Sequence, residues 1–174
     1  MLDKFVPDMH YQSIYRIDYE KLKSKGIKLI IFDLDNTISP INESLPPKEA
    51  VLLMYKLKEM GLIPVLMSNS HKKRVYNFRN SLEIDACASS KKPLSKNYKK
   101  IMKVYNVTQD KVACVGDQLL TDILGANKLN MVSILVNPMS KKDSKFTIFN
   151  RFIEKILFKI MDKQDIFKKG EYYE

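Results

Sequence analysis

The sequence contains few of the residues that cross-link a fold. Cys87 and Cys114 are the only cysteines, and both lie in apolar, strand-like segments. We therefore expect reduced thiols in the core rather than a disulfide. His10 and His71 are the only histidines, and neither has a second His or a Cys at metal-ligand spacing. Any chemistry is expected to come from other side chains.

Long apolar runs are also missing. The first residues hold no apolar stretch of signal-peptide length. The longest apolar run, about residues 62–67, is far shorter than the roughly 20 residues that cross a bilayer. We expect a cytoplasmic protein, with peripheral contact at the inner face of a membrane as a further option.

Positive charge is abundant and unevenly spread. The chain has 174 residues, of which 45% are hydrophobic, which suits one compact domain with a core. The formal net charge is +10, and residues 72–103 hold ten Lys and Arg against Glu83 and Asp85. This cluster indicates either an anionic partner, such as phosphate, nucleic acid or an acidic membrane, or a solvated helix face.

Strand-like apolar runs alternate with helical patterns. Residues 28–33 are typical of a buried strand, and a helix begins at Leu45-Pro46-Pro47 and ends at Gly61. We expect further strands over residues 63–68, 86–89, 112–116 and 132–136, and helices over 71–82, 94–105 and 119–128. This order predicts a Rossmann-like α/β fold, a parallel sheet flanked by helices on both faces.

Polar residues fall at the carboxyl ends of the predicted strands, where ligands bind in open parallel sheets. Each group alone could be a turn, a helix cap or a solvated lysine. Together they would place several carboxylates near one point, where mutual repulsion requires a cation or protons. Oxygen ligands favour magnesium, and a carboxylate can attack phosphorus. The groups are Asp33-Leu34-Asp35-Asn36-Thr37, Ser68-Asn69, Lys91-Lys92-Pro93, and Gly116-Asp117-Gln118 with Asp122.

These groups resemble the four motifs of the haloacid dehalogenase (HAD) superfamily: the Asp33 to Thr37 segment, Ser68, Lys92-Pro93, and Gly116-Asp117 with Asp122. The chain resembles subclass IIIA in particular, in the family that includes bacterial YqeG and the phosphatidylglycerophosphate phosphatases. The residues from Gly116 to Asp122 and the opening Phe5-Val6-Pro7-Asp8 are similar to that family.

The resemblance implies a role for each motif residue. Asp33 would be the nucleophile, and Asp35 the general acid and base. Mg²⁺ would be bound by Asp33, the backbone carbonyl of Asp35, and Asp117. Asp122 would orient Lys92 and the outer shell of the metal. The residues implied to contact the phosphoryl group are Thr37, Ser68, Asn69 and Lys92.

A carboxylate at position 35 also separates the resembled phosphatases from related ion pumps, which have Thr there. An acid–base group at this place favours rapid hydrolysis of an aspartyl-phosphate. The Asp33 and Asp35 pair likewise argues against a nucleic-acid or protein-binding module without turnover, so we expect no nucleic-acid partner.

The spacing of the motifs leaves no room for a cap domain. About 25 residues separate Thr37 from the second strand, and about 20 separate Ser70 from Lys91, enough for one helix each. An open site suits a substrate attached to something large, such as a lipid. We therefore expect dephosphorylation of phosphatidylglycerophosphate, with soluble nucleotide or sugar phosphates as the alternative.

The chain is expected to comprise a phosphatase domain over residues 1–140 and a basic amphipathic helix with a tail over residues 141–174, packed on the same domain. Three options stay open for this helix: a membrane interface, the protein's own core, or a second protomer. Basic residues Arg151, Lys155 and Lys159 lie opposite an apolar face. That face is formed by Phe149, Phe152, Ile153, Ile156, Leu157 and Ile160.

Overall fold

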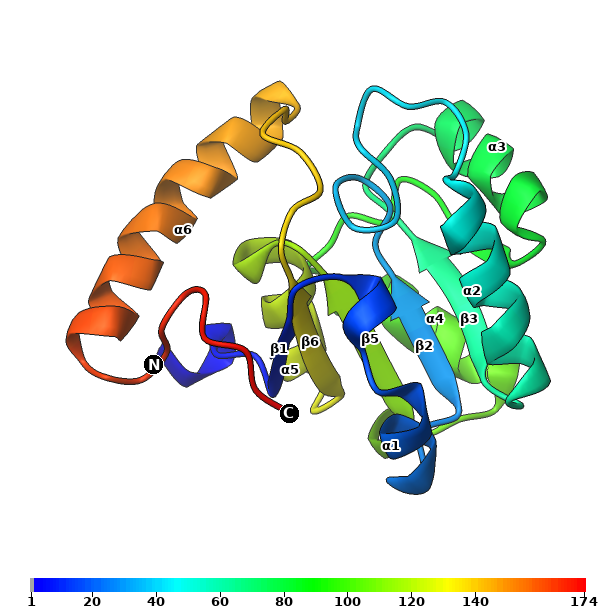
Figure 1. The fold of residues 1–174 in the computed structure, drawn as a ribbon, viewed down its shortest axis with the longest axis horizontal. Helices are drawn as coiled ribbons and strands as arrows, with labels where there is room; N and C mark the ends of the chain where they lie inside the picture. Colours follow the sequence, from blue (N-terminus) through cyan, green and yellow to red (C-terminus); the bar gives the residue numbers. More distant parts are fainter. Residues whose placement is uncertain (1) are drawn as a thin grey trace.

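The computed structural model describes residues 2–174, except for the side chains of residues 145 and 146. Six parallel strands form one sheet in the order β1-β6-β5-β2-β3-β4 (Figure 1). In chain order the strands are β1 (Met9–Tyr11), β2 (Leu29–Phe32), β3 (Ile63–Met67), β4 (Asp85–Cys87), β5 (Val112–Gly116) and β6 (Val132–Val136).

Helices cover both faces of the sheet, and the strands alternate their side chains between the two layers. On one face, Ile30 and Phe32 of β2 pack with residues of α1 (Tyr19–Ser24), α2 (Lys48–Glu59) and α3 (Lys72–Leu82). On the other face, Leu29 and Ile31 pack against α4 (Ser95–Tyr105) and α5 (Leu124–Asn127). The central strand is therefore apolar at every position, as a strand buried on both faces requires.

The predicted fold class is confirmed, and the expected strands and helices occur within a few residues of their predicted bounds. The helix predicted over residues 119–128 is instead a π-helical turn, Leu119–Ile123, followed by the short α5. Strand β1, helix α1 and three short 3-10 helices of the described chain were not predicted. Strand β1 has three residues, too few to show a periodicity, and it forms by pairing with β6 from the far end of the sequence.

Only single helices connect β2 to β3 and β3 to β4 among the described residues, so no cap domain interrupts these connections. The connection after β2 consists of a loop and α2, and the connection after β3 consists of a short loop and α3. Among residues 2–174, no helix is long and apolar enough to cross a membrane.

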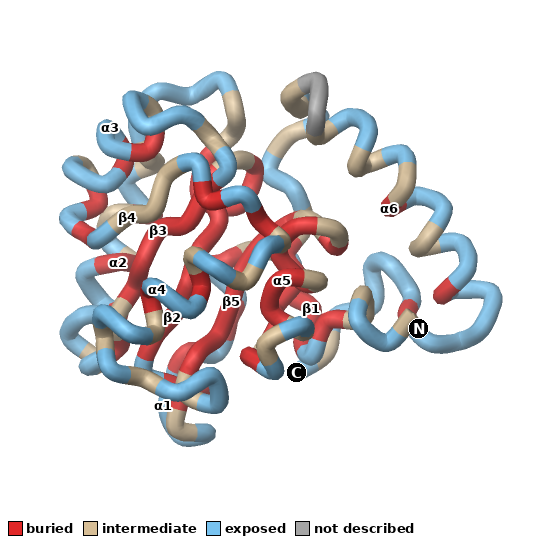
Figure 2. The backbone as a smooth tube through the Cα atoms, turned by 180° about the vertical axis from the view of Figure 1, so that it is seen from behind, coloured by how far each residue is buried: buried red, intermediate tan, exposed pale blue. Residues whose placement is uncertain are grey.

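The terminal helix α6 (Lys145–Lys163) lies within the segment 141–174 where an amphipathic helix was predicted, but its apolar residues do not share one environment. Met161 is buried, and Leu157 packs beside it against Leu119, Ile123 and Leu135. From residue 148 onward, the opposite side of α6 is exposed (Figure 2). The tail after α6 returns to the sheet, where Tyr173 and His10 exchange backbone hydrogen bonds of 2.8 and 3.0 Å.

Candidate active site

The direction in which the chain adds strands to the sheet reverses at β2, and the site lies at this switch point. From β2 the chain proceeds to β3 and β4 on one side, and then crosses to β5 and β6 on the other. Ligands in such sheets bind at the carboxyl ends of the two strands where the order reverses. Asp33 directly follows β2, and Asp117 directly follows the neighbouring β5.

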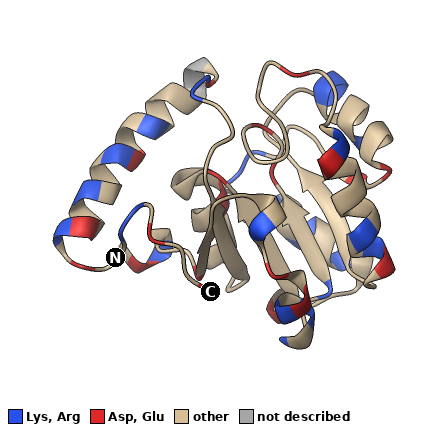
Figure 3. Ribbon diagram, viewed as in Figure 1, with Lys and Arg blue, Asp and Glu red and all other residues tan. Residues whose placement is uncertain are grey.

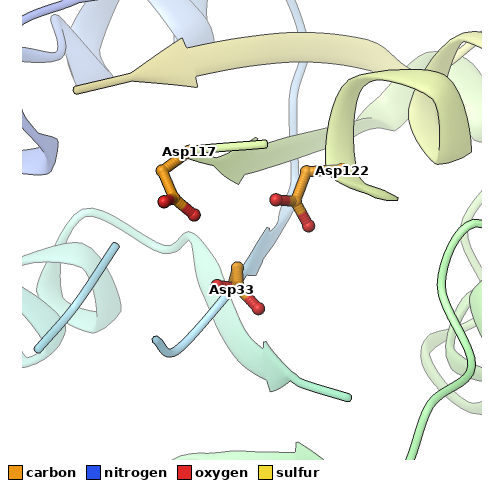
Figure 4. Close-up of side chains that lie close together, drawn as sticks. All are labelled: Asp33, Asp117 and Asp122. Carbon is orange, nitrogen blue, oxygen red and sulfur yellow. The ribbon is translucent and has the colours of Figure 1, made fainter. Parts of the chain in front are cut away.

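Three buried carboxylates gather at this point (Figure 4). One oxygen from each of Asp33, Asp117 and Asp122 lies within 4.8 Å of the others. Asp122 comes from the π-helical turn, and its second oxygen accepts a hydrogen bond from the Gln118 amide at 3.2 Å. Carboxylates this close repel one another unless a cation or protons separate them.

Lys92 reaches into this group from the loop after β4. Its Nζ lies 2.5 Å from Asp33 Oδ1 and 2.6 Å from Asp122 Oδ1, and all three side chains are almost fully buried. Asp122 and Asp33 therefore hold the Lys92 ammonium group between them. The ammonium group is placed where it would neutralise charge on a phosphoryl group bound to Asp33.

Burial dominates the electrostatics of the site. It raises the pKa of Asp33 to about 7, although the charge of Lys92 acts in the opposite direction. Burial also raises the pKa of Asp117 well above its usual range, against the lowering effect of Arg151. Three carboxylates thus share two neighbouring cations, so a divalent cation with a preference for oxygen ligands fits the group chemically.

Asp35 lies outside this trio. Its carboxylate accepts a hydrogen bond from Arg74 Nε at 2.8 Å and another from the Ser70 hydroxyl. The guanidinium of Arg74 also donates to the carbonyls of Pro40 and Glu43. The carboxylates that converge are consequently those of Asp33, Asp117 and Asp122, and the expected convergence of the Asp35 carboxylate with Asp33 and Asp117 is not seen.

The remaining motif residues, Thr37, Ser68 and Asn69, have different hydrogen-bond partners in the structure. Thr37 donates from its hydroxyl to Asp117 at 3.2 Å, and buried Ser68 accepts from the Ser70 amide at 3.1 Å. Asn69 uses its amide group on the Lys92 backbone, with its Oδ1 accepting from Lys92 N at 2.8 Å and its Nδ2 donating to Lys92 O at 3.3 Å. Asn69 therefore holds the loop of Lys92 in this structure, whereas the motifs implied a direct phosphoryl contact.

Two residues of α6 that contact the site, Arg151 and Glu154, were not predicted to do so from the sequence. Arg151 of α6 donates to the Asp117 carboxylate and, at 2.7 Å, to the Asp117 carbonyl. Glu154, one turn further, accepts from the Leu120 amide at 3.1 Å and from Arg151 at 3.0 Å. The available signal was that Glu154 is the single acidic residue between positions 145 and 161.

With this geometry in place, comparison with known proteins gives the class. A family model described as HAD-hydrolase-like matches residues 90–144, which include Lys92, Asp117 and Asp122. A solved structure with the same fold is 3-deoxy-D-manno-octulosonate 8-phosphate phosphatase from Moraxella catarrhalis, in complex with magnesium, phosphate and KDO. It superposes with a TM-score of 0.50 at 15% identity, covering 84% of this chain and 92% of that one.

Closer relatives give the family. The chain is 32% identical over 165 residues to the probable phosphatase YqeG of Bacillus subtilis (strain 168), which covers 94% of this chain and 96% of that protein. It is 24% identical to phosphatidylglycerophosphate phosphatase 1 of Arabidopsis thaliana over 82% of this chain and 44% of that protein. The chain therefore belongs to the YqeG family of HAD-type phosphatases and is a phosphatase of that type.

Proposed function

We propose that the protein hydrolyses a phosphomonoester through an aspartyl-phosphate formed on Asp33. The observation that carries this proposal is the position of the Asp33 carboxylate at the end of the central strand, 2.5 Å from Lys92 Nζ and grouped with Asp117 and Asp122. A carboxylate in this setting can attack phosphorus while the ammonium group neutralises the phosphoryl oxygens.

The reaction needs two displacements at phosphorus. In the first, an Asp33 oxygen bonds to phosphorus, the bond to the leaving oxygen breaks, and that oxygen takes a proton from the carboxylic acid of Asp35. In the second, the Asp35 carboxylate takes a proton from a water molecule whose oxygen attacks phosphorus. The bond to Asp33 then breaks, inorganic phosphate leaves, and Asp33 regains its carboxylate.

The exposure of the two carboxyl groups supports this division of roles. Asp33 is buried, whereas the side chain of Asp35 is 18% exposed and lies on the loop that leaves the sheet. A leaving group attached to a large substrate must extend toward solvent, where Asp35 can meet it. Thr37, Ser68 and Lys92 would contact the phosphoryl oxygens, and Asn69 would act through the position of Lys92.

Mg²⁺ fits the donor set of the site. It would be held by Asp33, the backbone carbonyl of Asp35, and Asp117, all of which offer oxygen ligands. When bound, it would supply charge stabilisation to the transferring phosphoryl group. The excess of buried carboxylates over neighbouring cations supports this assignment.

Phosphatidylglycerophosphate is the substrate that we favour. The Arabidopsis thaliana relative is named as a phosphatase of this lipid, and the described chain has no cap domain over the site. Soluble phosphomonoesters are the alternative, because the Moraxella catarrhalis phosphatase with the same fold is named for a soluble sugar phosphate. A binding module without turnover is disfavoured, since it would need neither the buried Asp33–Lys92 pair nor Asp35.

The test is a phosphate-release screen with Mg²⁺ that compares phosphatidylglycerophosphate in detergent micelles with soluble nucleotide and sugar phosphates. Asp33→Asn is the matched control: the amide is nearly isosteric, is a poor nucleophile, and should leave the protein folded by circular dichroism. Near wild-type turnover in Asp33→Asn would sink the mechanism. A wide preference for a soluble ester would overturn only the lipid substrate.

A further inference from the structure

Helix α6 is tied to the active site by its inner side. Arg151 contacts both the carboxylate and the carbonyl of Asp117, and Glu154 holds the Leu120 amide of the next turn. The loop that precedes α6 is tied as well, because Asn36 Nδ2 donates to the Lys142 carbonyl at 2.8 Å and to the Asp143 carboxylate at 3.0 Å. The beginning of α6 therefore lies beside the loops that hold Asp33 and Asp117.

The outer side of α6 has no partner in the described chain. Phe149 and Phe152 are 66% and 64% exposed, although they flank the inward-facing Arg151 in sequence. We define the outer face as the exposed residues of α6 with large apolar or basic side chains. They are Ile148, Phe149, Phe152, Lys155, Ile156, Lys159, Ile160 and Lys163.

The charges of the outer face match an anionic surface. Basic residues recur along α6 (Figure 3). Lys155 and Lys159 are exposed on the same side as Phe152, Ile156 and Ile160, which corrects the expectation that they lie opposite the apolar face. Lys163 is exposed there too, and Lys141 and Lys142 are exposed just before α6. A basic helix with Phe and Ile on the same exposed side is typical of segments that lie in a membrane interface. A second copy of the chain fits less well, because isologous pairing would bring the same lysines together.

A cavity between α6 and the body adds cations near the site. Its volume is about 400 Å³, and it is lined by Asp117 and Arg151 together with Lys155, Lys159 and Lys169. Lys155 and Lys159 thus border both this cavity and the outer face. An anionic group close to the lipid surface would meet these lysines within the same helix that contacts Asp117.

The geometry points to the outer face of α6 as a docking surface for an anionic lipid bilayer, which brings the Asp33 site to the membrane. This inference rests on the proposed function, since it names the surface on which that substrate would be met. The aromatic residues would enter the interface while the lysines contact lipid headgroups, and binding should weaken as salt screens the charges.

The experiment is sedimentation of the full chain with vesicles of phosphatidylglycerol and phosphatidylcholine in equal parts, with pure phosphatidylcholine vesicles in parallel. Phe149→Gln/Phe152→Gln should lower the partition onto anionic vesicles at least about tenfold. The matched control is Leu52→Gln/Val104→Gln, which changes side chains that are 69% and 67% exposed on α2 and α4 and should bind as wild type does. Lys155→Gln/Lys159→Gln provides a second test by charge alone.

Vesicle binding is measured without turnover, and Asp33→Asn should sediment as wild type does. A failure of the docking surface can therefore be told apart from a failure of the proposed phosphatase mechanism. The ratio of turnover on vesicle-borne to soluble phosphomonoester should also fall in the Phe149→Gln/Phe152→Gln protein. The docking surface is overturned if wild type ignores anionic vesicles or if both double variants on α6 bind them as wild type does. It is equally overturned if analytical ultracentrifugation shows a wild-type dimer that the Phe variant dissociates.

Discussion

Asp35 is held by a cation and a hydroxyl on the solvent side of the site, unlike the buried carboxylates beside it. An amide at this position keeps the shape but cannot exchange a proton with the leaving group or with water. We expect Asp35→Asn to slow turnover about a hundredfold or more. Phospho-enzyme should accumulate if the second displacement is slowed more than the first, which acid-quenched labelling with radioactive substrate would detect.

The control for this variant is Asp85→Asn, because Asp85 has an exposed side chain at the far edge strand β4. Its turnover should equal that of wild type. Unchanged turnover in Asp35→Asn itself would rule out the acid–base role.

Arg151 forms an ion pair with the Asp117 carboxylate, which would also be a ligand of the metal ion. Arg151→Gln leaves a buried carboxylate without its cation, so the free energy of unfolding in EDTA should fall by roughly 2 kcal/mol, less than for a fully buried pair. The same change removes a positive charge beside the proposed Mg²⁺ site. The Mg²⁺ concentration for half-maximal activity should therefore fall several-fold, by roughly the factor that 1 kcal/mol gives.

Lys163→Gln, on the same helix but exposed, is the control and should change neither quantity. A purely structural role for Arg151 would lower stability and leave the Mg²⁺ dependence unchanged. That result would remove Arg151 from the site as a positioning residue.

The approach of Asp33, Lys92 and Asp117 to one edge could be predicted, because each residue follows a strand and parallel strands end at one edge. The Asp35 carboxylate was predicted to join Asp33 and Asp117, and it pairs with Arg74 instead. The directions in which side chains point could not be predicted. Asn69 turns to the Lys92 backbone, and Arg151 and Arg74 reach their carboxylates from 34 and 39 residues away. Such contacts depend on how α6 and α3 pack, which no local pattern in the sequence encodes.

At the scale of the elements, β5 must pass into the π-helical turn with almost no space between them. A Cβ atom on Gly116 would overlap the carboxyl group of Asp122. Gly116→Ala should therefore displace Asp122 from Lys92 and cost about 2 kcal/mol or more of stability, as overpacking does. Turnover should fall with it, because Lys92 loses one of its two carboxylate partners.

Gly61→Ala is an instructive comparison. A Cβ atom there meets nothing within 4 Å, but Gly61 has a φ of 78° at the end of α2. The strain should cost about 1 kcal/mol without changing turnover. Thermal melting and phosphate release are the measurements. Wild-type stability together with wild-type turnover in Gly116→Ala would show that the close approach of Gly116 to Asp122 is not required.

Element types were predictable where a long apolar run or helical period exists, as in β2, α2 and α6. Element types were not predictable where an element forms only by contact with residues distant in the sequence. Met9–Tyr11 becomes a strand through β6, and the tail is held by Tyr173 on His10. The environment of α6 was also beyond the sequence, because its polar Arg151 and Glu154 face the body while Phe149 and Phe152 face outward.

For the molecule as a whole, stability and metal binding should be linked through the buried carboxylates. Burial raises the pKa of Asp33 to about 7, above its value in the unfolded chain. A group with a raised folded-state pKa favours the folded protein at low pH, and this contribution is lost as pH rises through the folded-state value. Without metal, the contribution of Asp33 should therefore be lost progressively between about pH 4 and about pH 7, and the loss should be complete above that range.

Mg²⁺ would reverse this loss, since it binds the ionised carboxylates and competes with protons. We expect Mg²⁺ to raise the melting temperature more at about pH 8 than at about pH 5.5, each measured against EDTA at the same pH. Burial lowers the pKa of His10, so its contribution has the opposite sign and is lost below about pH 6.5. Taking the difference between Mg²⁺ and EDTA at one pH cancels that contribution, because His10 contacts the C-terminal tail and not the site.

Asp33→Asn should show a much smaller Mg²⁺ shift of the melting temperature at both pH values. Ca²⁺ should restore little activity to the EDTA-treated wild type, because its longer bonds suit the site poorly. A Mg²⁺ shift that is absent at both pH values, or larger at the lower one, would contradict a metal site built on Asp33 and Asp117.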